Sequence, residues 1–143
     1  RKRVCELLSA SLRDEAFVKE VVDDGTSERH LAYEDKDLGF CIFGHRYEIA
    51  RSDVPPHDHG PSWAIYGQAR GETKMTDYAL VEAAAPGKPG KVRATRSYAI
   101  GPGDAYLYNE GDLHAPLREG PTRLVRIEGM NMDRVDRLKY AAI

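Results

Sequence analysis

Short apolar or alternating segments, separated by turn residues, occupy most of the chain between residues 31 and 130. Clusters of Gly, Pro and Asp, such as residues 101–104, interrupt the segments at near-regular spacing, and two Pro and two Gly place an exposed hairpin loop at 84–90. Many short strands in this arrangement predict a sandwich, a jelly roll or a barrel, and 143 residues suffice for one such domain. The segments expected to form strands are 40–43, 46–50, 63–66, 74–81, 92–100, 105–108 and 123–127.

The two ends of the chain follow a different pattern. Apolar residues at helical spacing predict a helical N-terminal extension over residues 1–24, built from one helix or from two. Ser11, three residues before Asp14, is a candidate cap for the second helix. We expect the β-barrel to cover residues 29–130. The alternation of charged and apolar residues in the tail, 131–143, favours a short closing helix.

Composition and charge exclude several classes of protein. A formal net charge of -2 provides no global attraction to nucleic acids or to anionic membranes. No stretch approaches the roughly 20 apolar residues of a membrane span, and Glu6 and Arg13 interrupt the apolar core that a signal peptide requires. Cys5 and Cys41 lie in apolar surroundings and provide no disulfide framework, so we expect unreactive buried thiols and a cytoplasmic protein.

Three of the five histidines occur in a pattern that suits a metal site. His57 and His59 are two residues apart, and in a strand such side chains point to the same face. His114 follows a short strand and a tight turn, an arrangement that can bring it beside the earlier pair. Imidazole nitrogens bind divalent metals at about 2.1 Å, so we predict one metal ion shared by these three side chains. The alternative is that His57 and His59 are surface histidines on a solvated turn. The other two histidines, His30 and His45, lie in no such motif.

The same residues resemble the two motifs of the cupins. Pro-His-Asp-His at residues 56–59, followed by Gly71, resembles the first motif, and residues 102–114 resemble the second. The resemblance implies a cupin double-stranded β-helix, which is a jelly-roll barrel, and by analogy a monomer or homodimer. The usual first motif adds a Glu a few residues after the second His, whereas here the first Glu after that His is Glu72. A metal site of three histidines without a carboxylate is therefore implied.

Among cupins, an all-histidine site is similar to that of the thiol dioxygenases, such as cysteine dioxygenase and mercaptopropionate dioxygenase. The helical N-terminal extension and the segment 29–31 are further similarities, and the Arg of that segment pairs with the substrate carboxylate in that family. The resemblance therefore implies Arg29 as a substrate-binding residue. The Ser-x-His-x-Tyr relay of the family is missing here, and Ala64 replaces the cysteine that forms a thioether crosslink with Tyr in some cysteine dioxygenases.

The strand that would carry this relay reads Leu-Val-Arg-Ile-Glu over residues 124–128. Its polar residues Arg126 and Glu128 alternate with apolar neighbours, so they face either the metal or the solvent. On the inward interpretation, Arg126 binds an anionic substrate and Glu128 acts as a general base. Tyr66 is a further candidate, with its hydroxyl either directed at a bound ligand or packed in the barrel wall.

These observations lead to the hypothesis of a mononuclear non-haem iron dioxygenase that oxidises a small anionic substrate with O₂. A thiol such as cysteine or a mercapto-acid is the implied substrate. Three neutral ligands leave the metal its full 2+ charge and open positions, which favours an anionic ligand. Affinity alone does not separate Fe(II) from Zn, Ni or Mn. The alternatives are another metal-dependent cupin enzyme, such as a diketone-type dioxygenase, an isomerase or a lyase, and a cupin that binds a ligand without catalysis.

Overall fold

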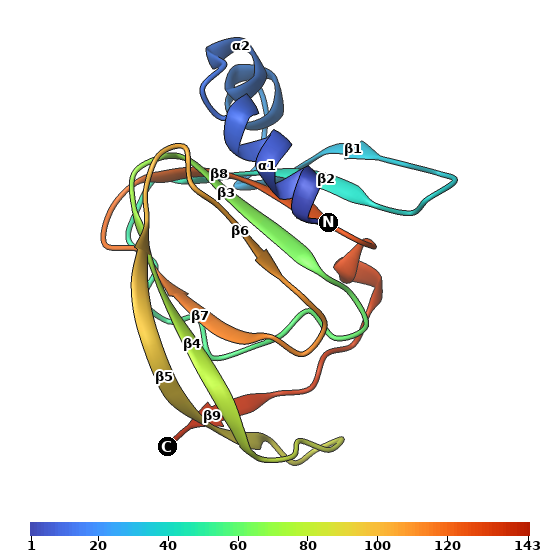
Figure 1. The fold of residues 1–143 in the computed structure, drawn as a ribbon, viewed down its shortest axis with the longest axis vertical. Helices are drawn as coiled ribbons and strands as arrows, with labels where there is room; N and C mark the ends of the chain where they lie inside the picture. Colours follow the sequence, from blue (N-terminus) through green and yellow to red (C-terminus); the bar gives the residue numbers. More distant parts are fainter.

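Two β-sheets curl around one interior and form a jelly roll in the computed structural model, which describes residues 1–143 (Figure 1). One sheet has five strands in the order β1-β2-β8-β3-β6, and the other has four in the order β7-β4-β5-β9. The predicted fold class is therefore confirmed. The strands are β1 (Arg29–Glu34), β2 (Cys41–Tyr47), β3 (Ala64–Arg70), β4 (Thr73–Glu82), β5 (Gly90–Ile100), β6 (Ala105–Tyr108), β7 (Leu113–Leu117), β8 (Thr122–Glu128) and β9 (Tyr140–Ala142).

The N-terminal extension covers the outer face of the five-stranded sheet (Figure 1). It consists of α1 (Lys2–Ser11), α2 (Glu15–Val18) and a π-helical turn, η1 (Lys19–Asp23), so the two-helix alternative is the one observed. Apolar side chains of the helices and of the outward faces of β3 and β8 form one cluster, which buries the face that a bare sheet would expose. Its members are Leu8, Leu12, Val18, Val21, Val22, Ile65, Val125 and Ile127.

Two glycines allow this close packing of helix on sheet. A Cβ atom at Gly67 in β3 would lie 2.7 Å from the Cδ2 atom of Leu8, and one at Gly44 in β2 would overlap the carbonyl oxygen of Val21. Glycine avoids both collisions because it has no side chain. Gly44 lies within a continuous strand, so the predicted segments 40–43 and 46–50 are joined in β2, which ends at Tyr47 and leaves 48–50 outside it.

Asp14, and not Ser11, caps α2. The Asp14 carboxylate accepts hydrogen bonds from the backbone N–H groups of Ala16 at 2.9 Å and Phe17 at 3.4 Å. The Ser11 hydroxyl instead donates to the carbonyl of Leu7 at 3.0 Å, within α1. The expectation for Ser11 is wrong because that residue is still helical, where a serine hydroxyl bonds back to the preceding turn.

Strand β8 is buried on both of its faces. Val125 and Ile127 point outward into the helix cluster, so the alternate residues Leu124, Arg126 and Glu128 point into the barrel. The interior also holds an apolar cluster from both sheets. Its members are Ala64, Tyr66, Met75, Ile100, Tyr108 and Leu124.

The tail does not form the expected closing helix. A 3₁₀ turn, η2 (Met132–Arg134), is followed by an extended segment that crosses to the second sheet (Figure 1). There, β9 pairs in parallel with β5, whose free edge offers unpaired N–H and C=O groups. This pairing outweighs the helical spacing of the tail. The predicted loop at 84–90 does connect β4 to β5. None of the helices has the length and apolar character that crossing a membrane requires.

Candidate metal centre

A short backbone bridge brings the two histidine segments together. The N–H of His57 donates to the carbonyl of His114 at 2.9 Å, and the N–H of His114 donates to the carbonyl of His57 at 2.9 Å. One ligand nitrogen from each of His57, His59 and His114 lies within 4.8 Å of the other two. Nitrogens bound to one ion at about 2.1 Å are at most about 4.2 Å apart, so a small ring movement allows the three to share an ion. The group can therefore hold a single metal ion.

The hydrogen bonds of the rings leave free nitrogens for this purpose. Nδ1 of His57 lies 2.9 Å from the carbonyl of Pro55, and Nδ1 of His114 lies 2.9 Å from the carbonyl of Asp112. A carbonyl only accepts, so each Nδ1 carries the proton and each Nε2 keeps its lone pair. Nε2 of His114 and Nδ1 of His59 are buried without a partner. Orphaned buried nitrogens fit a metal ion, and backbone carbonyls behind the rings are typical of metal-binding histidines.

Burial also keeps these rings neutral. It is the main cause that lowers the pKa of His57 to about 4 and that of His114 to about 3. The pKa of His59 falls even further, first because of burial and then because of the positive charge of Arg126. The neutral imidazole is the form that binds a metal, so all three side chains are ready as ligands at neutral pH.

No carboxylate belongs to the histidine group. The Asp58 carboxylate accepts from the N–H of Gly60 at 3.0 Å and from the hydroxyl of Tyr140 at 3.3 Å, so it is occupied elsewhere. Glu72 is exposed at the turn between β3 and β4. The group is therefore three imidazoles without Asp or Glu, as the resemblance to the cupin motifs implies.

Tyr66 on β3 stands between the histidines and the nearest charges. It is buried, and its hydroxyl oxygen lies 3.4 Å from Nε2 of His59. On its other side, the guanidinium of Arg126 lies over the Tyr66 ring at 4.4 Å from the centroid. Burial raises the pKa of the phenol, so the hydroxyl keeps its proton. With Nδ1 of His59 free to bind a metal, Nε2–H donates to the Tyr66 oxygen, and the phenol proton remains available to another acceptor. Tyr66 thus lies beside the candidate metal centre.

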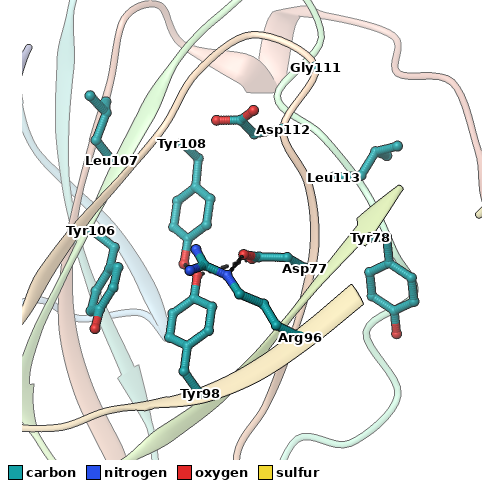
Figure 2. A pocket seen from close by; sticks show the side chains of 10 residues that line it. All are labelled: Asp77, Tyr78, Arg96, Tyr98, Tyr106, Leu107, Tyr108, Gly111, Asp112 and Leu113. Carbon is teal, nitrogen blue, oxygen red and sulfur yellow. Dashed lines mark hydrogen bonds and ion pairs between the residues drawn. The ribbon is translucent and has the colours of Figure 1, made fainter. Parts of the chain in front are cut away.

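A second phenol connects the histidines to the surface. The ring of Tyr108 stacks on His114 with 4.1 Å between centroids, and its hydroxyl lies 2.7 Å from that of Tyr98. Tyr98 in turn donates to Asp77 at 3.0 Å, and Arg96 binds the same carboxylate at 2.6 Å. Figure 2 shows the two phenols with Asp77 and Arg96. They line a pocket with a volume of about 260 Å³. The wall behind His114 is therefore a hydrogen-bonded pair of phenols.

Three charged residues continue from Tyr66 toward the rim. Nη1 of Arg126 lies 3.4 Å from Oε1 of Glu128, and Oε2 of Glu128 lies 3.5 Å from Nη2 of Arg29. Both Arg126 and Glu128 face inward, with side chains 15% and 1% exposed. Arg29 lies over the Phe43 ring at the rim, and Asp133 binds it from outside at 2.5 Å. The structure thus selects the inward alternative for Arg126 and Glu128 but gives Arg29 two carboxylate partners.

The histidine group reaches the surface through His57. This ring is partly exposed and borders a pocket of about 530 Å³ together with Pro55, Pro56 and residues 137–141 of the tail. His59 and His114 are fully buried. Ligands therefore approach the centre beside His57, between the proline segment and the tail.

The sequence analysis missed a polar cluster deeper in the barrel. Arg118 is only 2% exposed and its guanidinium lies 4.8 Å from the centroid of the Tyr47 ring. The Tyr47 hydroxyl lies 2.9 Å from Nδ1 of His45, a ring that is 1% exposed. Strand alternation was the available signal, because residues 114, 116 and 118 share one face. Once His114 faces inward, Arg118 must do so as well.

Comparison with solved structures identifies the fold, whereas comparison of sequences does not. The sequence matches no protein-family model, and no curated protein matches it. Solved structures do match. KdgF from Halomonas sp. aligns with a TM-score of 0.54 and 13% identity over 75% of this chain and 82% of that one. The cupin domain of Cnp3 from Schizosaccharomyces pombe aligns with a TM-score of 0.54 and 8% identity over 72% of this chain and 60% of that one.

A third match is a double-stranded β-helix protein from Klebsiella pneumoniae, with a TM-score of 0.52 and 13% identity over 78% of this chain and 80% of that one. The chain has the cupin fold. At these identities the likeness concerns the cupin fold alone, so the thiol dioxygenase hypothesis has to stand on the site itself.

Proposed function

We propose that this cupin is a mononuclear non-haem iron dioxygenase that oxidises a small anionic thiol. The observation that supports the proposal is the set of three neutral imidazoles without a carboxylate, two of them fully buried, near the mostly buried cation Arg126. An Fe(II) ion in this group would supply the O₂ and thiolate chemistry. A ligand set without negative charge favours an anionic substrate, and Arg126 adds to that preference.

The residues around the histidines would orient the substrate. The Tyr66 hydroxyl lies beside His59, with its proton available for a bound substrate, and Arg126 places its positive charge over the same phenol. Glu128, the candidate general base, lies between two guanidinium groups, so we assign it the role of holding Arg126 in position. Arg29 is compensated by Asp133 and Glu128, which makes it a rim residue in this proposal.

The metal is tested first, on protein purified without a histidine tag. Mass spectrometry of the metal content should find about one iron per chain after anaerobic loading. His114→Ala should abolish metal retention, whereas His30→Ala, outside the group, should retain it. Equal retention by both variants would contradict the centre itself.

The reaction is tested by O₂ consumption of the iron-loaded protein with cysteine, 3-mercaptopropionate and cysteamine. The two mercapto-acids should support turnover better than cysteamine, which has no carboxylate. No turnover with any thiol at full iron loading would contradict the dioxygenase proposal.

One observation favours a second candidate function. Strand β8 carries Arg126 and Glu128, and it has no Ser-x-His-x-Tyr relay. A metal-dependent lyase or isomerase that acts on an anionic substrate needs no such relay and no O₂. Metal-dependent conversion of a carboxylate substrate under anaerobic conditions, together with no thiol oxidation, would select this candidate.

A further inference from the structure

Arg118 is a buried cation without a counter-ion. Its side chain is among the largest that are fully buried, and its Nε and Nη2 atoms have no hydrogen-bond partner. No carboxylate forms an ion pair with it; its neighbours are the Tyr47 ring at 4.8 Å and, on the adjacent segment, another arginine, Arg51. A buried guanidinium that is neither paired nor hydrogen-bonded is strongly unfavourable, so its presence calls for a partner that the chain does not supply.

The positive charge that lacks a partner is that of Arg118. Arg126 is mostly buried, with 15% of its side chain exposed, and it pairs with the buried Glu128 at 3.4 Å. Arg29 pairs with Asp133 at the rim. No carboxylate is paired with Arg118, so a single bound monoanion would neutralise it.

The free atoms of Arg118 define the kind of anion. Nε–H and Nη2–H lie side by side on one edge of the guanidinium and point in the same direction. This edge binds a carboxylate through two parallel hydrogen bonds. The Tyr47 ring packs against the guanidinium and keeps the fork in place. One unpaired guanidinium beside an aromatic ring matches a carboxylate better than a doubly charged phosphate.

We propose that Arg118 is the carboxylate-binding residue of this cupin, in an interior subsite on the same strand face as His114. The inference deepens the proposed function, on which it rests for the identity of the substrate, and it moves the carboxylate from Arg29 to Arg118. His114 and Arg118 are four residues apart along the extended segment, roughly 13 Å between Cα atoms. The carboxylate subsite therefore lies toward the Arg118 end of this face, and the histidines lie toward the other.

The test uses metal-free protein, so that it does not depend on catalysis. Thermal unfolding is followed with sodium propionate, sodium phosphate or sodium chloride at equal ionic strength. Propionate should raise the midpoint of the wild type above the chloride value, and phosphate should raise it less. Arg118→Met should raise the midpoint without propionate, because it removes an unpaired buried charge, and should abolish the propionate effect.

Two further variants separate binding from folding. Arg123→Met is the matched control, since Arg123 is partly buried on the neighbouring β8 but paired with Glu48 at 2.8 Å, so its response to propionate should persist. Arg118→Lys keeps the charge and loses the fork, so titration calorimetry should show at least tenfold weaker propionate binding even if Arg118→Met does not fold.

Two results would overturn the assignment. One is an equal propionate response in wild type, Arg118→Met and Arg118→Lys. The other is a response to phosphate but not to propionate. Failure of the dioxygenase proposal looks different: propionate would still bind through Arg118, while the iron-loaded protein would consume no O₂ with thiols.

Discussion

At the scale of single residues, the interior of this barrel depends on one carboxylate. Glu128 lies between Arg126 and Arg29 and is almost completely buried. Glu128→Gln removes the negative charge and leaves Arg126 as an uncompensated buried cation. We expect the free energy of unfolding to fall by about 3 kcal/mol, as for other broken buried ion pairs.

Urea unfolding of the two proteins measures this difference. Glu34→Gln is the control, because Glu34 forms its ion pair with Arg134 in a more exposed setting and its loss should cost less than about 1 kcal/mol. Similar losses for both variants would show that Glu128 does not stabilise the buried arginine.

His45 should make the stability of the metal-free protein depend on pH. Burial, followed by the charges of Arg126 and Arg29, lowers the pKa of this ring well below its ordinary value near 6.5. Below about pH 6.5 the unfolded chain therefore binds a proton that the folded chain does not. The contribution of His45 to stability is complete above that pH and is lost as the pH falls, by about 1.4 kcal/mol per pH unit.

The measurement compares wild type with His45→Gln by urea unfolding at pH 7.5, 6 and 5. On acidification, the free energy of unfolding of the variant should fall less steeply than that of the wild type, by about 1.4 kcal/mol per pH unit. Parallel curves would mean that His45 is protonated in the folded state.

These residues also show where sequence reasoning reaches its limit. The approach of the three histidines to one another could be predicted because their spacing and the turns around them are local features. The direction of Arg126 and Glu128 could not, because alternation in β8 gives two faces and the helices bury the outer one. Arg118 was missed because one arginine at the end of a strand resembles a surface residue until its neighbour His114 is known to face inward.

At the scale of elements, the contact between η1 and β2 is set by Gly44. A side chain there would overlap the backbone of Val21, which cannot move away as a flexible side chain would. Gly44→Ala should therefore destabilise the fold by about 1–3 kcal/mol through overpacking. Gly120→Ala is the control, since a Cβ at Gly120 meets no atom within 4 Å. Equal unfolding midpoints for the two variants would contradict this account of how the helices pack.

The secondary structure predicted from the sequence is correct for most strands and wrong for the tail. Most strands were predictable because their alternation and turns act locally, and the hairpin at 84–90 needed only its Pro and Gly residues. Strand β1, at 29–34, was not among the expected segments. The tail was predicted as a helix from its spacing, yet it pairs with β5. A free strand edge is a property of the assembled sheet, so it cannot be read from the tail itself.

At the scale of the whole molecule, a metal ion would join segments that are far apart in the chain. His57 and His59 belong to the loop before β3, and His114 belongs to β7 in the other sheet. An ion bound to all three favours the state in which these segments lie together, because the separated segments do not form the site. Metal binding should therefore stabilise the entire fold and not only the rim of the site.

Cys41 reports on that separation. It is fully buried on β2, away from the histidines, and burial, followed by the charges of Glu34 and Glu128, raises its pKa to about 11. We expect iodoacetamide to label it only through unfolding, whereas the partly exposed Cys5 should react in the folded state.

The experiment uses Ni²⁺ as a redox-stable substitute for iron and follows labelling by intact mass. At about 100 times its Kd, Ni²⁺ should slow the labelling of Cys41 about 100-fold and leave the labelling of Cys5 unchanged. His114→Ala should lose this protection because it cannot hold the ion. If Cys41 labels equally fast with and without Ni²⁺ in protein that has bound the ion, the opening that exposes β2 is local, and the two sheets do not unfold as one unit.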